Sequence, residues 1–271
     1  MKSFFGTDGI RNRVGTGLFT LEKLQSLGHS IAHWAIAKYE KPRILITSDS
    51  RASAAFIKAS LKSSLLLENI QIYDGGELPT PMSFFAITKL DLFDCALVIS
   101  ASHNPWHDNG VKLFCRETGK LSIHDEQKID SLLTNGLSYR PSYAKFGIDI
   151  PWNQALEFYS TFLLKQFPSR FLEGKHIVLD TAHGALSHMA YPLFTLFGAN
   201  VTVINNSPTG YNINDRCGVL DPCSLKKAIA RLKADIGFAF DGDGDRVLAI
   251  NKHGTIKTGE DLLALLLTNT Q

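Results

Sequence analysis

Short runs of apolar, often β-branched residues alternate along the chain with longer segments whose apolar residues recur at helical spacing. The runs predict strands at 43–47, 70–74, 95–100, 176–180, 201–205 and 236–240. The amphipathic segments predict helices near 20–38, 52–67, 154–166, 185–196 and 224–233. Continuously apolar strands separated by helices are typical of sheets that are covered on both faces. We therefore predict an α/β fold.

The pattern breaks once near the middle of the chain. Residues 136–152 combine glycine, proline and serine without a clear period, as a linker does. We predict two consecutive three-layer α/β/α domains with mixed, mostly parallel sheets, at 1–150 and 151–258. Residues 259–271 begin a helix with a leucine-rich face that requires a partner. We interpret this segment as the start of a third, truncated domain.

Composition excludes several classes of function. The 271 residues include 28 basic and 26 acidic ones, and this balance gives no reason to expect nucleic acid or a membrane surface as partner. No apolar run approaches the about 18 residues of a membrane span, and the N-terminus lacks the apolar core of a signal peptide. The four cysteines form no CxxC pair. They indicate reduced thiols in a cytoplasmic protein rather than a zinc site.

The most informative segment is FAFDGDGDRV at 238–247. Asp241, Asp243 and Asp245 alternate with glycines after a predicted strand, so on an extended chain their carboxylates lie on one side. The glycines let the backbone curl, so that the carboxylate oxygens can converge on one point. Because these charges repel one another, a divalent cation that prefers oxygen ligands, magnesium first, would stabilise the cluster. The alternative is a solvated Asp-Gly turn. An EF-hand is excluded because Arg246 stands where its loop requires glycine.

A second candidate lies where the apolar run at 95–100 gives way to the polar stretch ASHNPWHDNGVK, which we expect to be a loop. Ser102 stands at the end of a predicted parallel strand, the edge at which open α/β sheets bind ligands. A serine needs a base or a metal to act as a nucleophile. On an extended chain the side chains of Ser102 and His103 point apart, so His103 is better suited to contact a substrate than to take the serine proton. Lys112 would act as a base only if burial or cationic neighbours disfavoured its charge. The alternative is an Asn-Pro turn.

A third candidate is FGTDGIR at 5–11, in which two glycines flank Thr7 and Arg11 follows. Such a loop suits a phosphate through backbone N–H groups and a bidentate guanidinium, although an N-terminal turn is the simpler interpretation. Together the three segments offer a cation site, a serine at a strand end and basic side chains. This combination favours phosphoryl transfer through a phosphoserine, with the charge of the phosphates offset by the basic residues.

At these residues the chain resembles the α-D-phosphohexomutases. GTDGIR, ASHNP…DNGVK and DGDGDR occur in the family's order and at its usual separations, and the shorter matches are SDSRAS (48–53), LPTP (78–81) and DTAHGA (180–185). Within the family, SASHNPWHDNGVKLF and GYNINDRCG (210–218) are most similar to the phosphoglucosamine mutases. These enzymes interconvert glucosamine 6-phosphate and glucosamine 1-phosphate on the way to UDP-N-acetylglucosamine and the cell wall.

The resemblance implies a role for the serine and the aspartates. Ser102 would carry the phosphoryl group in the resting enzyme, donate it to the sugar phosphate and recover it from a 1,6-bisphosphate. Asp241, Asp243, Asp245 and an oxygen on phosphorylated Ser102 would bind one Mg²⁺ per chain. Glucosamine 1,6-bisphosphate or a similar sugar bisphosphate would act as activator.

The resemblance also assigns the basic residues. Arg11, Arg246 and Thr7 would contact the catalytic phosphate, with Arg11 also counted among the catalytic residues. His103 and Lys112 would be the acid/base candidates for the sugar hydroxyl. The substrate would be a hexosamine phosphate, and the site would need no nucleic acid and no membrane.

Full-length relatives have four domains, and the sugar-reading loop of the third and the phosphate clamp of the fourth are not found in this sequence. We therefore expect poor isomerisation by this chain alone, and its protein partner would be a second copy or a complementing C-terminal half. The alternatives are a phosphomannomutase/phosphoglucomutase of the same superfamily, a hydrolase in which water takes the phosphoryl group, and a non-catalytic half that binds metal or phosphate.

Overall fold

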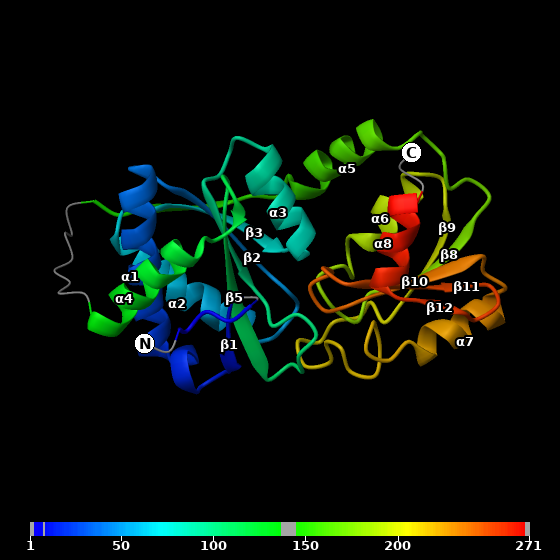
Figure 1. The fold of residues 1–271 in the computed structure, drawn as a ribbon, viewed down its shortest axis with the longest axis horizontal. Coiled ribbons are helices and arrows are strands. Elements are labelled where there is room, and N and C mark those ends of the chain that lie inside the picture. The colour runs from blue at the N-terminus through cyan, green and yellow to red at the C-terminus, as the bar shows by residue number, and fades with distance from the viewer. Residues whose placement is uncertain (1–2, 8, 137–144, 269–271) are drawn as a thin grey trace. The chain divides into compact units, whose positions relative to one another are not determined.

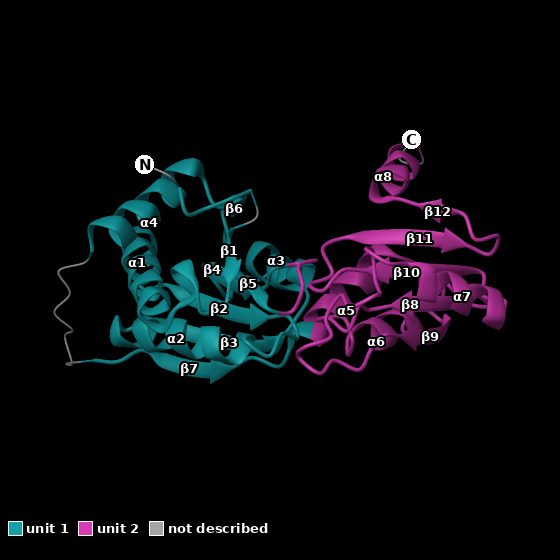
Figure 2. Cartoon of the chain, turned by 90° about the horizontal axis from the view of Figure 1, so that it is seen from below, with its two compact units in different colours: residues 1–101, 107–155 teal, residues 102–106, 156–271 magenta. Residues whose placement is uncertain are grey.

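The computed structural model describes residues 3–7, 9–136 and 145–268, and Figure 1 shows the order of its elements. The chain divides into two compact units, coloured separately in Figure 2. Unit 1 comprises residues 1–101 and 107–155, and unit 2 comprises residues 102–106 and 156–271. The short segment 102–106, which carries Ser102, therefore belongs to the second unit although both its flanks belong to the first.

The described strands of unit 1 form one mixed sheet in the order β1-β5-β4-β2-β3-β7, with β6 paired to β5. Their bounds are β1 (Ile10–Arg13), β2 (Arg43–Ser48), β3 (Gln71–Glu77), β4 (Cys95–Ile99), β5 (Asp108–Cys115), β6 (Gly119–Lys120) and β7 (Ile148–Pro151). The pairings from β4 through β2 and β3 to β7 are parallel, whereas β5 runs antiparallel to both β4 and β1.

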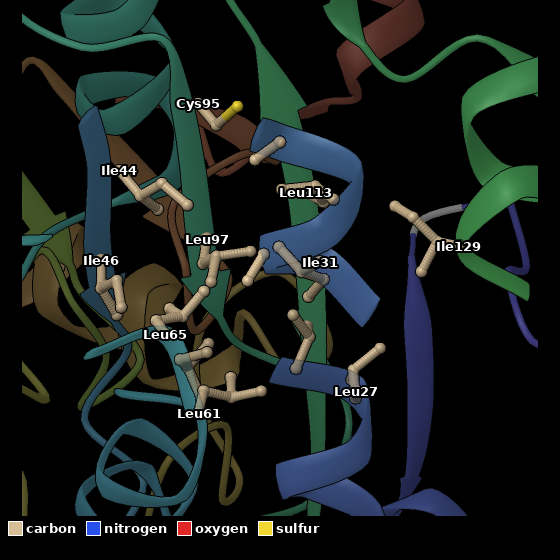
Figure 3. Close-up of a cluster of buried hydrophobic side chains, with 14 of the residues drawn as sticks. Leu27, Ile31, Ile44, Ile46, Leu61, Leu65, Cys95, Leu97, Leu113 and Ile129 are labelled. Atoms are coloured by element: carbon tan, nitrogen blue, oxygen red, sulfur yellow. The ribbon is translucent and has the colours of Figure 1, made fainter. Parts of the chain in front are cut away.

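Helices cover both faces of this sheet. They are η1 (Gly17–Phe19), α1 (Leu21–Tyr39), α2 (Ala54–Leu67), α3 (Thr80–Lys89) and α4 (Ile123–Asn135). Leucines and isoleucines of α1, α2 and α4 pack on alternate residues of β2, β4 and β5 and form the core drawn in Figure 3. On the other face, Phe84 of α3 meets Phe114 of β5 edge to face at 5.9 Å. Successive side chains of these strands therefore point to opposite faces of the sheet, and each face packs against helices.

Unit 2 repeats the plan with the strand order β12-β11-β10-β8-β9. Its elements are α5 (Ala155–Gln166), β8 (His176–Asp180), α6 (Ala190–Thr195), β9 (Asn200–Ile204), α7 (Cys223–Leu232), β10 (Ile236–Phe240), β11 (Val247–Asn251), β12 (Ile256–Lys257) and α8 (Gly259–Thr268). Ile177 and Leu179 pack on the side of α6, and Val178 between them packs on the side of α7. Two three-layer α/β/α units with mixed sheets are thus confirmed. The sheets are not mostly parallel, because among the described strands antiparallel pairings are as frequent as parallel ones.

The structure corrects three of the predicted elements. The predicted linker contains the strand β7, whose residues pair in parallel with β3. The polar stretch after β4 is a loop only as far as His107, because Asp108–Cys115 forms β5 against β4. The helix predicted at 185–196 is shortened to α6, and the residues before it form turns in which the Ser187 N–H donates to the Gly184 carbonyl at 3.0 Å and the Met189 N–H to the Leu186 carbonyl at 3.1 Å.

The predicted C-terminal helix is α8, and its leucines Leu263, Leu265, Leu266 and Leu267 are exposed. None of the helices in the described ranges is both long and apolar enough to cross a bilayer.

Candidate functional site

The three aspartates follow β10 directly. One carboxylate oxygen from each of Asp241, Asp243 and Asp245 lies within 4.8 Å of the other two, with Asp241 and Asp243 buried and Asp245 exposed. The oxygens converge because the glycines let the backbone curl, as the sequence predicts. The segment is a turn, in which Gly244 has a φ of 70° and its N–H donates to the Asp241 carbonyl at 3.0 Å.

The electrostatics of this cluster favour a bound cation. Burial, followed by the neighbouring Asp243 and Asp245 carboxylates, raises the pKa of Asp241 to about 7. Hydrogen bonds from Ser102 and from the Arg246 backbone act in the opposite direction. A divalent cation would remove the mutual repulsion, and carboxylate oxygens are the ligands that hard cations prefer. The donor set therefore fits Mg²⁺.

Ser102 lies against these carboxylates. It is fully buried, and its Oγ donates to Oδ2 of Asp241 at 2.5 Å. The residue has a φ of 55°, a left-handed conformation that a non-glycine residue adopts only where its surroundings enforce it. The chain is therefore not extended here, and the prediction that His103 points away from Ser102 is wrong. The turn brings His103 Nδ1 to 3.4 Å from the Ser102 Oγ.

A buried network in unit 1 holds the two strands from which the Ser102 loop departs. Asp49 accepts hydrogen bonds from Ser100 Oγ at 2.6 Å and from Arg51 Nε at 2.9 Å, and both partners of the ion pair are inaccessible to solvent. Arg51 also donates to the carbonyl of Asp108, the first residue of β5. The end of β4 and the start of β5 are thus tied to one carboxylate, which accounts for the SDSRAS segment.

Two other candidates, Arg11 and Lys112, lie on neighbouring strands of unit 1. Arg11 on β1 is paired with Gly110 on β5, and Lys112 is two residues further along β5. Both side chains therefore lie on the same face of the sheet, opposite the face that carries Val111 into the α1 core. Lys112 belongs to a strand and is buried, contrary to the loop that its sequence context predicts.

The glycine loop before β1 is closed by a hydrogen bond from the Gly6 N–H to the Gly9 carbonyl at 2.9 Å. Thr7 at its tip is exposed, and its carbonyl accepts from Lys120 Nζ at 2.5 Å; Asp8 lies outside the described residues. Arg246 is also exposed, and its N–H donates to Asp241 Oδ1 at 3.1 Å. The candidate residues thus form two groups. Ser102, His103, Arg246 and the aspartates lie in unit 2, whereas Thr7, Arg11 and Lys112 lie in unit 1.

Sequence reasoning did not single out Asn214. Its Nδ2 donates to the carbonyls of Ser102 at 2.9 Å and of Asn104 at 3.2 Å. This residue lies in the GYNINDRCG segment, which was noted only for its similarity to the phosphoglucosamine mutases. Nothing in a single sequence links residue 214 to residue 102.

Comparison with known proteins identifies the two units. The model of phosphoglucomutase/phosphomannomutase alpha/beta/alpha domain I matches residues 2–140, and that of domain II matches residues 157–254. Among curated proteins, a phosphoglucosamine mutase of Nitrosospira multiformis is 37% identical over 98% of this chain and 58% of its own length. One of Renibacterium salmoninarum is 39% identical over 98% of this chain and 59% of its own length. The chain thus spans somewhat over half the length of these relatives.

Solved structures share the fold. A putative phosphomannomutase of Thermus thermophilus aligns with 98% of this chain and 61% of its own, with a TM-score of 0.83 at 20% identity. A phosphoglucomutase/phosphomannomutase family protein of Burkholderia thailandensis aligns with 93% of this chain and 55% of its own, with a TM-score of 0.78 at 23% identity. The matches to both α/β/α domains confirm the resemblance to phosphohexomutases, and the chain belongs to the phosphoglucomutase/phosphomannomutase family.

Proposed function

We propose that this chain transfers a phosphoryl group between Ser102 and a hexosamine phosphate, as part of a phosphoglucosamine mutase that interconverts glucosamine 6-phosphate and glucosamine 1-phosphate. The observation that carries the proposal is the 2.5 Å hydrogen bond from Ser102 Oγ to Asp241, inside the cluster of three carboxylates. A buried serine hydroxyl is thus held against a cluster of like charges. It suits a nucleophile that works beside a cation.

In this proposal Asp241, Asp243 and Asp245, with an oxygen on phosphorylated Ser102, hold Mg²⁺. When bound, the ion polarises a phosphoryl oxygen and offsets its charge. Ser102 Oγ loses its bond to phosphorus as the sugar hydroxyl oxygen forms one. Ser102 Oγ then takes the other phosphoryl group from the resulting bisphosphate, which restores the phosphoserine and releases the isomeric monophosphate. A 1,6-bisphosphate is the intermediate, and glucosamine 1,6-bisphosphate is the activator that phosphorylates the bare serine.

The basic residues complete the proposed site. Arg11, Arg246 and Thr7 bind phosphate, and His103 and Lys112 exchange the proton of the sugar hydroxyl. His103 Nδ1, 3.4 Å from Ser102 Oγ, is near the atom where the phosphoryl group is carried. An acid/base group has to come within hydrogen-bond reach of its proton, and apo distances are often longer than those of the reacting complex.

The hexosamine is proposed because the curated relatives named above are phosphoglucosamine mutases at 37% and 39% identity. We also propose domains at 1–150 and 151–258, with a third beginning at 259–271. We propose a cytoplasmic location as well, since the four cysteines are free, as thiols are in a reducing compartment.

The test follows the sugar and the protein together. The chain is incubated with Mg²⁺, glucosamine 1,6-bisphosphate and glucosamine 6-phosphate, while ³¹P NMR records glucosamine 1-phosphate and peptide mapping locates bound phosphoryl. We expect phosphoryl on Ser102 and only slow exchange of the two monophosphates, both abolished in Ser102→Ala and retained in Ser63→Ala. Phosphoryl incorporation that survives in Ser102→Ala would contradict the proposal. Release of inorganic phosphate without exchange would identify a hydrolase. Faster exchange of mannose or glucose phosphates would show that one of these sugars, and not glucosamine, is the substrate.

A further inference from the structure

We infer that Asn214 is a positioning residue for phosphoryl transfer, which holds the Ser102 loop so that the Ser102 hydroxyl faces the three aspartates. The inference rests on the proposed role of Ser102. Asn214 comes from the loop between β9 and α7, far along the chain from the serine, yet both belong to unit 2. No acid, base or metal role is required of it.

The contact is specific for an amide. Asn214 Nδ2 donates to the backbone carbonyls of Ser102 at 2.9 Å and Asn104 at 3.2 Å. Both partners are acceptors only, so the NH₂ group must face them, and the two bonds use both of its protons. These carbonyls stand on either side of His103. Fixing both of them orients the peptide groups that follow Ser102, and so restrains its left-handed backbone.

The backbone of Asn214 is itself held in place by hydrogen bonds. Its backbone N–H donates to the Ala182 carbonyl at 2.9 Å, and Asn214 has a φ of 59°, which asparagine tolerates better than most residues. The fully buried Asp180 at the end of β8 accepts from the Ala182 N–H and the Gly218 N–H, each at 3.0 Å. The Asp180 carboxylate thus fixes Ala182, which binds the Asn214 N–H, and Gly218, which follows Asn214 in the same loop, and Asn214 passes that restraint to the Ser102 loop.

Two further contacts restrict the same loop. A Cβ atom added to Gly242 would stand 2.8 Å from both the Ser102 carbonyl oxygen and Asn214 Nδ2, so the aspartate turn packs directly on this junction. Trp106, at the far end of the loop, meets Tyr211 edge to face at 5.1 Å. The loop is therefore held at both ends, and the amide of Asn214 holds the end that carries the nucleophile.

The expected effect on the reaction follows from geometry. A reacting atom displaced by about 1 Å can cost on the order of 100-fold in rate, because the reaction needs a near-attack arrangement. Substrate binding groups elsewhere are not displaced. Loss of the amide should therefore lower the maximal rate of transfer and leave the half-saturating concentration of substrate nearly unchanged.

Asn214→Asp and Asn214→Gly are the informative variants. Asp keeps the size but turns two oxygens toward the carbonyls, and Gly removes the side chain while accepting the left-handed backbone. The matched control is Asn205→Asp with Asn205→Gly. Asn205 is also in unit 2, is left-handed at a φ of 51°, and donates its Nδ2 to the hydroxyl of Ser224 rather than to the Ser102 loop.

Two readouts are taken on the full chain. The first is the rate at which Ser102 is phosphorylated by glucosamine 1,6-bisphosphate with Mg²⁺, over a range of bisphosphate concentrations. The second is ¹⁹F NMR of protein labelled with 5-fluorotryptophan, which gives one resonance for each of the three tryptophans. Trp106 reports the loop, whereas Trp34 and Trp152 report unit 1.

We expect both Asn214 variants to lower the maximal rate at least about 10-fold, to shift the Trp106 resonance and to leave the other two unchanged. The Asn205 variants should match the wild type in both readouts. Wild-type rates in the Asn214 variants, an unmoved Trp106 resonance, or equal losses in the Asn205 variants would each overturn the inference. If even the wild type is never phosphorylated, the proposed function fails, and the Trp106 resonance still decides whether Asn214 holds the loop.

Discussion

At the scale of single residues, the site is built from unfavourable backbone conformations that hydrogen bonds hold in place. Ser102, Ala182 and Asn214 all have left-handed φ values, between 53° and 59°, and they are linked in one chain of hydrogen bonds. Each left-handed non-glycine residue costs on the order of 1 kcal/mol or more. Such a cost persists only where the surroundings over-determine the conformation, and here the outcome is a fixed direction for one hydroxyl.

Gly242 tests this packing by size alone. Its φ is ordinary, but a methyl group there would approach the Ser102 carbonyl oxygen and Asn214 Nδ2 at 2.8 Å. We expect Gly242→Ala to slow phosphorylation of Ser102 by about 10-fold or more. Gly259→Ala is the control, because its nearest neighbouring atom is 3.9 Å away. Equal rates for Gly242→Ala and the control would show that the junction is loose.

Asp243 tests the cation site. Replacing it with Asn removes one carboxylate while keeping the shape of the turn, and we expect roughly 10-fold or greater loss of Mn²⁺ affinity, measured by EPR or calorimetry. Asp215→Asn, at an exposed aspartate of the same unit, should bind the ion as the wild type does. Unchanged affinity in Asp243→Asn would place the cation elsewhere.

At the scale of elements, the loop that carries Ser102 depends on the strands that flank it. The carboxylate of Asp49 ties β4 to Arg51, and Arg51 reaches the first residue of β5. A buried ion pair of this kind adds little net stability, but breaking it leaves an uncompensated charge. Its role here is to fix the end of β4 and the start of β5.

We expect Arg51→Met to lower the free energy of unfolding by about 3 to 5 kcal/mol, measured by urea denaturation, because Asp49 would stay buried without its partner. The control is Arg170→Met. Arg170 pairs with Glu173 on the surface, where both side chains are more than half exposed, and its loss should cost no more than about 1 kcal/mol. Similar losses in both variants would mean that other groups compensate the Asp49 charge when Arg51 is removed.

A second ionic cluster sets how the edge of unit 1 responds to acid. Burial alone would raise the pKa of Asp74 on β3, but hydrogen bonds from Lys58 and Lys62 of α2 outweigh it and hold the pKa below 3.8. Lys62 also pairs with Asp149 of β7 at 2.8 Å. A carboxyl whose pKa is lowered by folding contributes stability above its unfolded pKa, and this contribution is lost as the pH falls through the folded value.

We therefore expect Asp74→Asn to be less stable than the wild type at pH 7 by about 1 to 2 kcal/mol and to lose less stability between pH 5 and about 3. Urea denaturation across that range measures both effects. Asp91→Asn, whose side chain is 94% exposed, should follow the wild-type curve. An Asp74→Asn curve parallel to the wild type would refute the linkage.

The elements that the sequence predicts well are those in which the apolar residues are the ones that helices bury. The strands at 176–180 and 236–240 agree with the structure in both ends because each is buried between two helices. The pattern failed where hydrogen bonds that it does not encode decide the structure. Residues 185–189 form turns with bonds between residues three apart, such as Ser187 to Gly184, and β5 is a strand because it pairs with β4 despite its polar start.

The same distinction holds for the site. Three aspartates within five residues are local, and their spacing alone predicts a cluster. Asn214 acts on a serine 112 residues away, and no pattern along one sequence encodes that distance.

At the scale of the whole molecule, the serine proposed as nucleophile and the aspartates come from different stretches of the chain but from one compact unit. The loop at 102–106 lies in unit 2, whereas the strands on either side of it lie in unit 1. The family models treat these stretches as domain I and domain II, and residue 102 falls within the first. The proposed chemistry therefore draws its serine from the stretch matched by domain I and its carboxylates from the stretch matched by domain II.

The most direct measurement is the intact mass of the purified chain before and after incubation with Mg²⁺ and glucosamine 1,6-bisphosphate, followed by peptide fragmentation to locate any added phosphoryl group. We predict the gain of a single phosphoryl group, on Ser102, and no gain in Ser102→Ala. A chain that binds the cation at its aspartates yet leaves Ser102 bare, or that carries the phosphoryl group on another residue, would contradict the account.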